Sequence, residues 1–172
     1  MIVSLMTQIP LIKVVVAGNG NVGKTSLIRQ YCEGRFETSR VATIGVDFQT
    51  KIVQLPKQTI KLSIWDMAGQ SHFSSVRQGF YRGSRAAALV FDITSAESFA
   101  QLVDWRAEIQ RIVPKQRFLV VGNKVDLPRV VDQGQAYGFA RKIKAPYLET
   151  SAATGERVQD LFRFLALLAT IV

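Results

Sequence analysis

Short apolar runs alternate with longer segments of mixed polarity along most of the chain. Four runs rich in β-branched or aromatic residues are predicted to be strands: Ile12–Ala17, Lys61–Trp65, Ala86–Ile93 and Arg117–Asn123. Apolar residues follow one another in these runs, as expected for strands covered on both faces. The weaker run Pro146–Ser151 is predicted as a further strand.

One segment shows a different period. Apolar and polar residues alternate over Val46–Leu55, and the turn sequence PKQT then leads into Lys61–Trp65. Alternation followed by a short turn and a second strand is typical of a β-hairpin. We therefore expect these two strands to be antiparallel.

The segments between the strands are long enough for helices. The predicted helices are Lys24–Glu33, Val76–Tyr81, Ala96–Ile112, Gln133–Ile143 and Arg157–Ala169. Ser95 can cap the third of them. Alternating strands and helices predict an α/β fold with a mostly parallel sheet, in which ligands bind beyond the carboxyl ends of the strands.

Composition favours one globular domain of 172 residues, of which 48% are hydrophobic and 20% charged. We expect residues 1–11 to form a loosely ordered leader and residues 12–172 the domain. A single cysteine excludes an internal disulfide and suits a reducing compartment. The apolar end FLALLATIV is expected to belong to a docked helix rather than to a membrane anchor.

The net charge of +9 is compatible with a nucleic acid, an anionic membrane surface or acidic partners. The 22 basic residues are scattered along the sequence and form no run. No nucleic-acid recognition motif accompanies them, so we expect no nucleic-acid partner. Solvated basic faces are the favoured interpretation at this stage.

A glycine-rich stretch follows the first predicted strand. Gly18–Thr25 fits the pattern G-x-x-x-x-G-K-[ST] and precedes a predicted helix, which is the context of a phosphate-binding loop. Backbone N–H groups and the helix dipole can bind phosphate, Lys24 can neutralise it, and the Thr25 hydroxyl can bind Mg²⁺. An ordinary turn is the alternative. The predicted phosphate-binding residues are Gly20, Asn21, Val22, Gly23, Lys24, Thr25 and Ser26.

The phosphate-binding loop indicates a nucleoside triphosphate but not its base, and the sequence VGNKVDL bears on which base is bound. Asn123, Lys124 and Asp126 follow a predicted buried strand. The Asp126 carboxylate can accept the two N–H donors of guanine, whereas adenine offers no matching pair and would leave a buried carboxylate unpaired. The alternative is a polar loop that only ends a strand.

Two further segments carry candidates for metal binding and hydrolysis. In SIWDMAGQ, Asp66 can hold Mg²⁺, Gly69 can donate to a γ-phosphate, and Gln70 can orient an attacking water. In VATIGVDF, Thr43 can supply a second hydroxyl to Mg²⁺, although a threonine before a strand is common.

These motifs, together with Glu149–Ala153 (ETSAA), resemble the five guanine-nucleotide motifs of the Ras superfamily in order and spacing. TIGVDF, IWDMAGQ and FYRGSRA are most similar to the Rab branch. The resemblance implies a small G domain with a six-stranded, mostly parallel sheet, one antiparallel strand and helices on both faces. It also implies a switch that binds GTP or GDP with Mg²⁺ and hydrolyses GTP slowly, with Gln70 and Lys24 in catalytic roles.

The resemblance assigns further residues by position. Phe36 falls where an aromatic ring packs on guanine, and backbone N–H groups of Ser151 and Ala152 fall where they meet the guanine oxygen. Gly20 falls where bulk would obstruct hydrolysis. Phe48, Trp65 and Phe80 match the aromatic triad that Rab-like proteins offer to effectors, and plain packing is the alternative for them. Effectors, exchange factors and GTPase-activating proteins are the implied partners of a monomer.

Several positions depart from the family pattern. Met67 replaces a threonine, Ser71 a glutamate and Ala153 a lysine, while Arg40 stands where many relatives carry an aromatic residue. Arg40 is either a surface residue or an arginine supplied to the transition state. The sequence contains no lipidation motif. We expect a cytoplasmic protein and leave peripheral membrane association open. A guanine-nucleotide scaffold with little hydrolysis is the main alternative, and a P-loop kinase or ATPase the remoter one.

Overall fold

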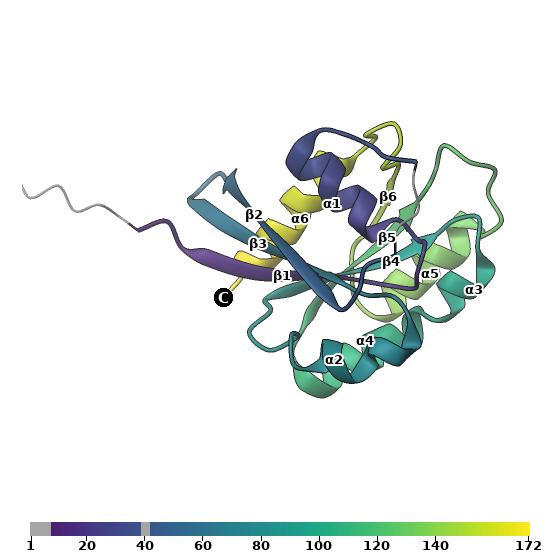
Figure 1. Cartoon of the computed structure of the whole chain (residues 1–172), viewed down its shortest axis with the longest axis horizontal. Coiled ribbons are helices and arrows are strands. Elements are labelled where there is room, and N and C mark those ends of the chain that lie inside the picture. The colour runs from purple at the N-terminus through teal and green to yellow at the C-terminus, as the bar shows by residue number, and fades with distance from the viewer. Residues whose placement is uncertain (1–7, 39–41) are drawn as a thin grey trace, which may run out of the picture.

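The computed structural model describes residues 8–38 and 42–172. Its centre is a six-stranded sheet with the strand order β2-β3-β1-β4-β5-β6 (Figure 1). The strands are β1 (Leu11–Ala17), β2 (Val46–Gln54), β3 (Thr59–Met67), β4 (Ala86–Asp92), β5 (Arg117–Asn123) and β6 (Tyr147–Thr150). Five strands are parallel and β2 is antiparallel, which confirms the predicted fold class.

The β2–β3 hairpin is the antiparallel part. Val46 pairs with Met67 and Gln54 with Thr59. Strand β1 then lies between β3 and β4, so the first strand of the chain is central in the sheet. A hydrogen bond from Lys61 N to Pro10 O, 2.9 Å long, continues the β1–β3 ladder before Leu11. Strand β1 thus starts one residue earlier than predicted.

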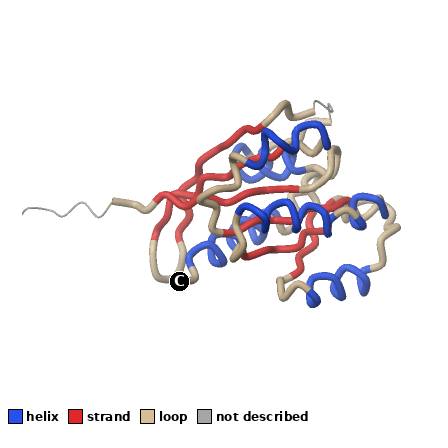
Figure 2. Tube along the Cα trace, turned by 90° about the horizontal axis from the view of Figure 1, so that it is seen from below, coloured by secondary structure: helices blue, strands red, loops and turns tan. Residues whose placement is uncertain are grey.

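Helices cover both faces of the sheet (Figures 1 and 2). They are α1 (Lys24–Glu33), α2 (Ser74–Gln78), α3 (Ala96–Ala100), α4 (Leu102–Ile112), α5 (Gln133–Lys142) and α6 (Val158–Thr170), with a 3₁₀ turn η1 at Ser71–Phe73. Helices α1 and α6 pack on one face and α4 and α5 on the other. None of the helices in the described ranges is long and apolar enough to cross a membrane.

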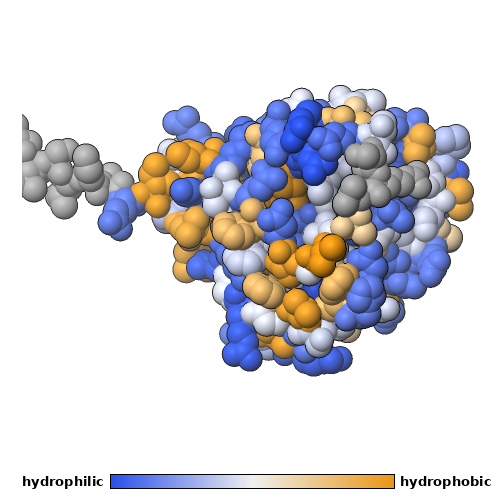
Figure 3. Space-filling model, viewed as in Figure 1, coloured by the Kyte–Doolittle hydropathy of each residue, from blue (hydrophilic) through white to orange (hydrophobic). Residues whose placement is uncertain are grey.

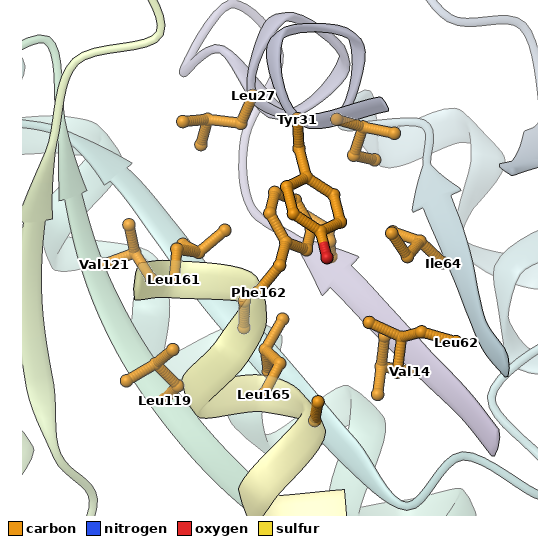
Figure 4. Close-up of a cluster of buried hydrophobic side chains, with 14 of the residues drawn as sticks. Val14, Leu27, Tyr31, Leu62, Ile64, Leu119, Val121, Leu161, Phe162 and Leu165 are labelled. Carbon is orange, nitrogen blue, oxygen red and sulfur yellow. The ribbon is translucent and has the colours of Figure 1, made fainter. Parts of the chain in front are cut away.

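The first core cluster lies between the sheet and helices α1 and α6 (Figure 4). Tyr31 of α1 stacks on Phe162 of α6 with ring centroids 4.3 Å apart. Val14 and Val16 of β1 face this cluster, whereas Val15 and Ala17 face the cluster under α4 and α5. Alternate residues of a central strand serve two cores, which explains its uninterrupted apolar sequence.

Two helix predictions were wrong in detail. The segment Ala96–Ile112 is divided at Gln101, because Asp104 N bonds to Gln101 O in a tighter i→i−3 turn. The helix predicted at Val76–Tyr81 spans Ser74–Gln78 instead, and Tyr81 is fully buried in the second core. The predicted cap is confirmed: Ser95 Oγ accepts a hydrogen bond from Ser98 N at 3.2 Å. Residues 1–7 of the predicted leader lie outside the described residues.

Candidate nucleotide-binding site

A cavity of about 350 Å³ opens beyond the carboxyl ends of the parallel strands. It is within the size range of small-ligand sites in proteins. The predicted residues that line it are Gly20, Asn21, Gly23, Lys24, Thr25, Ser26, Phe36, Thr43, Gly69, Gln70, Asn123, Lys124, Asp126 and Ala152. Val22, Asp66 and Ser151 are buried next to it. The fold therefore brings the separate motifs together at one place.

The loop between β1 and α1 has a conformation that depends on glycine. Gly18 and Gly23 have φ values of 147° and 100°. A Cβ atom at Gly18 would overlap the carbonyl oxygen of Val90, and one at Gly23 would overlap the side-chain amide of Asn123. These glycines keep the loop backbone pressed against β4 and β5, where its N–H groups can line the cavity.

Lys24, at the start of α1, is buried under this loop. Its Nζ donates to Gly18 O at 2.7 Å and to Asn19 O at 2.6 Å. Burial lowers the pKa of Lys24 to about 8, although the nearby Asp66 carboxylate acts in the opposite direction. An anion in the cavity would favour the charged ammonium. The side chain is thus held where a phosphate group would be adjacent.

Three oxygen-bearing side chains from three segments meet beside Lys24. Thr25 Oγ1 lies 2.7 Å from Thr43 Oγ1 and 2.5 Å from Asp66 Oδ2. Asp66 Oδ1 is buried and has no hydrogen-bond partner among the described residues. Burial also raises the pKa of Asp66, even with the Thr25 hydrogen bond and Lys24 opposing it. Two hydroxyls and a carboxylate with one uncompensated oxygen fit the oxygen-ligand preference of Mg²⁺.

Gly69 and Gln70 follow β3 and lie against the phosphate-binding loop. A Cβ atom at Gly69 would overlap the backbone of Asn19 and Gly20. A Cβ atom at Gly20 would lie 3.7 Å from Gln70 Nε2, so the glutamine side chain lies next to Gly20. Gln70 Oε1 is buried without a hydrogen-bond partner among the described residues. Its amide is therefore available at the cavity to orient a polar group such as water.

Asn123, at the end of β5, ties three loops together. Its Nδ2 donates to Val22 O at 2.9 Å, and its Oδ1 accepts from Thr150 Oγ1 at 3.0 Å and from Ala152 N at 3.3 Å. Asn123 is almost fully buried, with 1% of its surface exposed. In this structure it fixes the phosphate-binding loop relative to the loops after β5 and β6.

Asp126 lies in the loop after β5 and is exposed at the edge of the cavity. Asp126 Oδ1 accepts a hydrogen bond from Ser151 Oγ at 2.7 Å. The backbone N–H of Ser151, which the resemblance assigned to the guanine oxygen, donates in this structure to Glu156 O at 3.1 Å, and the Ser151 hydroxyl orients the Asp126 carboxylate. Any selectivity at Asp126 depends on this orientation of its carboxylate.

The remaining predicted residues surround the same end of the cavity. Lys124 has a φ of 70° and pairs with Asp92 Oδ2 at 2.8 Å. Phe36 is exposed and lines the cavity from the segment after α1. Of the positions that depart from the family pattern, Met67 and Ala153 also line the cavity. Arg40 lies outside the described residues.

Sequence reasoning missed a polar network behind the site. Trp105 Nε1 donates to Asn19 Oδ1 at 2.8 Å, and the guanidinium of Arg77 lies 4.3 Å from the Trp105 ring. Arg77 donates to Ala68 O at 2.9 Å, to Gln70 O at 2.6 Å, and to both carboxylate oxygens of Glu108 at 2.9 and 3.0 Å. Arg77 and Glu108 are 31 positions apart, so no local pattern could have paired them.

The predicted aromatic triad is a contiguous surface feature. The ring centroids of Phe48 and Trp65 are 4.9 Å apart, and those of Trp65 and Phe80 are 5.6 Å apart. Lys13 Nζ lies 4.3 Å from the Trp65 ring. Phe48 and Phe80 are exposed. An exposed apolar cluster of this kind is compatible with a partner surface.

A phosphate-binding loop, a buried lysine and a hydroxyl–carboxylate cluster at the strand ends define a P-loop nucleotide-binding domain. The sequence profile of the Ras family matches residues 13–170, and the chain belongs to this family.

Its relatives place it in the Rab branch of small, GTP-binding GTPases. The Ras-related protein Rab-30 of Homo sapiens is 44% identical over 159 residues, covering 91% of this chain and 78% of the relative. The Ras-related protein RABG3e of Arabidopsis thaliana is 43% identical over 162 residues, covering 88% of this chain and 79% of the relative. The GTP-binding protein YPT1 of Saccharomyces cerevisiae is 41% identical over 159 residues, covering 91% of this chain and 77% of the relative.

Proposed function

We propose that this chain is a Rab-like molecular switch that binds GTP or GDP with Mg²⁺ and slowly hydrolyses bound GTP. The observation that carries the proposal is the cluster of Thr25, Thr43 and Asp66 beside Lys24. Thr25 Oγ1 lies within 2.7 Å of oxygens from both other segments, and one Asp66 oxygen has no partner among the described residues. This arrangement has the charge and the ligand atoms that a triphosphate and its magnesium ion require.

Each side chain has a role in hydrolysis that follows from its position. Lys24 and the loop N–H groups stabilise negative charge on the β- and γ-phosphates as it develops. Gln70, held next to Gly20, orients a water for in-line attack on the γ-phosphorus. Thr25, Thr43 and Asp66 would hold Mg²⁺, which would neutralise phosphate charge.

The same geometry supports a switch. Thr43 precedes β2, and Gly69 follows β3 and lies against the phosphate-binding loop. A γ-phosphate would bind both segments, and its loss would release them. The triad Phe48, Trp65 and Phe80 lies on the two strands and the segment after α2 that adjoin these switch regions, so effectors could detect the change there. We further propose, by family analogy, a role in vesicle traffic.

Guanine selection is assigned to Asp126, with Lys124 and Asn123 supporting the loop and Phe36 facing the base. The Ser151 hydroxyl orients the Asp126 carboxylate through a 2.7 Å hydrogen bond. Asp126→Asn replaces one acceptor oxygen by a donor, so it should weaken GTP binding and favour xanthine nucleotides. Unchanged GTP affinity in this variant would count against the assignment.

Single-turnover hydrolysis tests the proposed reaction. Protein loaded with GTP should convert it to GDP when Mg²⁺ is present, and Gln70→Leu should retain GTP binding while the rate falls on the order of tenfold or more, as for loss of a group that positions the nucleophile. Gln78→Leu, in α2, is the matched control and should leave the rate unchanged. Negligible hydrolysis by the unaltered protein would instead support a scaffold that only binds the nucleotide.

A further inference from the structure

The basic residues that are scattered in the sequence gather at one end of the molecule. The parallel strands begin there, and the helices that return from the carboxyl ends of the strands finish there. The segments that form this end are 8–13, 54–61, 82–85, 111–117, 141–146 and 167–172. They contain eleven of the 22 basic residues of the chain and no aspartate or glutamate. We call these six segments the basic end.

Strand register establishes that the segments share one end. Leu11 pairs with Lys61 in the β1–β3 ladder, and Arg117 pairs with Ala86 in the β4–β5 ladder. Arg85 N donates to Lys13 O at 2.9 Å, which joins the starts of β1 and β4. In Figure 1 the start of β1, the β2–β3 hairpin and the C-terminus lie together on the left, away from the loop between β1 and α1.

The charges of the basic end are not neutralised within the described residues. Every ion pair among the described residues involves a basic residue outside the basic end, such as Arg29, Arg77 or Lys124. Of the eleven basic residues, only Lys13 and Arg117 are partly buried, and the other nine are exposed. This end therefore presents a concentration of unpaired positive charge.

Helix dipoles account for only part of this charge. Arg111 is in the last turn of α4, and Arg141 and Lys142 are in the last turn of α5, where cations offset the helix dipole. Lys57 is in the β2–β3 turn and Lys61 is on β3, where no helix ends. Charge placed only for solubility would be mixed in sign. The uniform sign points to an anionic partner.

Exposed apolar side chains lie among these charges. Leu11 and Ile52 flank Lys61 in register across three strands, and they are 65% and 59% exposed. Ile9 is exposed just before β1. Figure 3 shows hydrophobic residues gathered at the left, over the start of β1. Exposed aliphatic side chains would contribute little to binding a nucleic acid, whereas they stabilise binding at the boundary between lipid headgroups and acyl chains.

We propose that the basic end docks on an anionic lipid surface. Lysine and arginine side chains contact headgroup phosphates and carboxylates, while Ile9, Leu11 and Ile52 enter the headgroup boundary. The nucleotide cavity opens at the other end of the sheet, so docking leaves it accessible to regulators. Docking through the basic end does not require GTP hydrolysis.

Vesicle co-sedimentation tests the proposal with the full chain. Vesicles that contain phosphatidylserine should bind the protein at low salt, and pure phosphatidylcholine vesicles should bind it much less. Each basic side chain near an anionic surface contributes on the order of fivefold to partitioning. The variant K57E/K61E/R85E should therefore lose at least about tenfold in binding.

A matched control separates location from net charge. The variant R129E/R157E/R163E makes the same change in net charge outside the basic end and should keep most of the binding. Leu11→Ser with Ile52→Ser should remove the part of the binding that persists at high salt. Equal losses in the two charge variants, absence of binding to the anionic vesicles, or retention on single-stranded RNA but not on vesicles would overturn the proposal. Nucleotide content and melting temperature confirm that each variant is folded.

Discussion

The indole Nε1–H of Trp105 donates a hydrogen bond to Oδ1 of Asn19, 2.8 Å away, and so joins α4 to the phosphate-binding loop. The same indole ring lies under the guanidinium of Arg77. Arg77 in turn donates to the backbone oxygen of Gln70 at 2.6 Å. Two motifs of the nucleotide site are therefore connected through a tryptophan that belongs to neither.

Trp105→Phe tests this connection, because it removes the N–H donor and keeps an aromatic ring. One hydrogen bond contributes about 0.5–1.5 kcal/mol, so single-turnover GTP hydrolysis should slow by roughly twofold to tenfold. GTP affinity should change less. In a double-mutant cycle with Asn19→Ala, the combined variant should be no slower than the slower single variant. Additive effects would show that the two residues act independently.

Arg77 should be important for folding stability as well as for Gln70. Only 2% of Arg77 is exposed, and it forms a two-pronged pair with Glu108. Arg77→Met leaves the Glu108 carboxylate half-buried without its partner, which should lower the free energy of unfolding by about 3–5 kcal/mol. The control Arg111→Met, at an exposed position in the last turn of α4, should change it by no more than about 1 kcal/mol. Urea denaturation measures both, and similar small values would contradict the buried network.

Removal of the Mg²⁺ that Asp66 is proposed to hold should weaken nucleotide binding. EDTA should accelerate release of a fluorescent GDP analogue on the order of tenfold or more, because Mg²⁺ held through Asp66 would no longer neutralise the phosphate charge. In Asp66→Ala, release should already be fast and respond little to EDTA. Asp47→Ala, which removes an exposed carboxylate on the neighbouring strand, is the control and should respond as the unaltered protein does. A full EDTA response in Asp66→Ala would mean that the metal is held elsewhere.

Two glycines with positive φ should differ in their tolerance of alanine. Gly34, the C-cap of α1, has a φ of 68° and no neighbour within 4 Å of an added Cβ. Gly34→Ala should therefore cost only about 1–2 kcal/mol, the strain of the left-handed conformation. Gly23→Ala adds an overlap with the Asn123 amide and should also weaken nucleotide binding. Thermal unfolding and nucleotide titration measure the two effects, and equal behaviour would contradict the close approach at Gly23.

Much of the fold and site was predictable because the signals are local. The loop Gly18–Thr25 is continuous in sequence, and the apolar strands that precede the motifs place each motif at the same edge of the sheet. The helix Lys24–Glu33 was predicted with its observed bounds.

The features that were missed depend on side chains far apart in sequence. Nothing near Trp105 indicates a bond to Asn19, 86 positions away. The hydrogen bond from Ser151 Oγ to Asp126 also joins residues 25 positions apart and has no local signal in the sequence. The basic end is likewise invisible in sequence, since segments from the whole chain contribute to it.

The nucleotide released when the purified protein is denatured distinguishes a guanine-nucleotide switch from its alternatives. Ion-exchange chromatography separates the four relevant nucleotides, GDP, GTP, ADP and ATP. The proposed switch predicts GDP, the product of guanine-selective binding and slow turnover. GTP alone would show binding without hydrolysis, and an adenine nucleotide would contradict the assignment of Asn123, Lys124 and Asp126 to guanine.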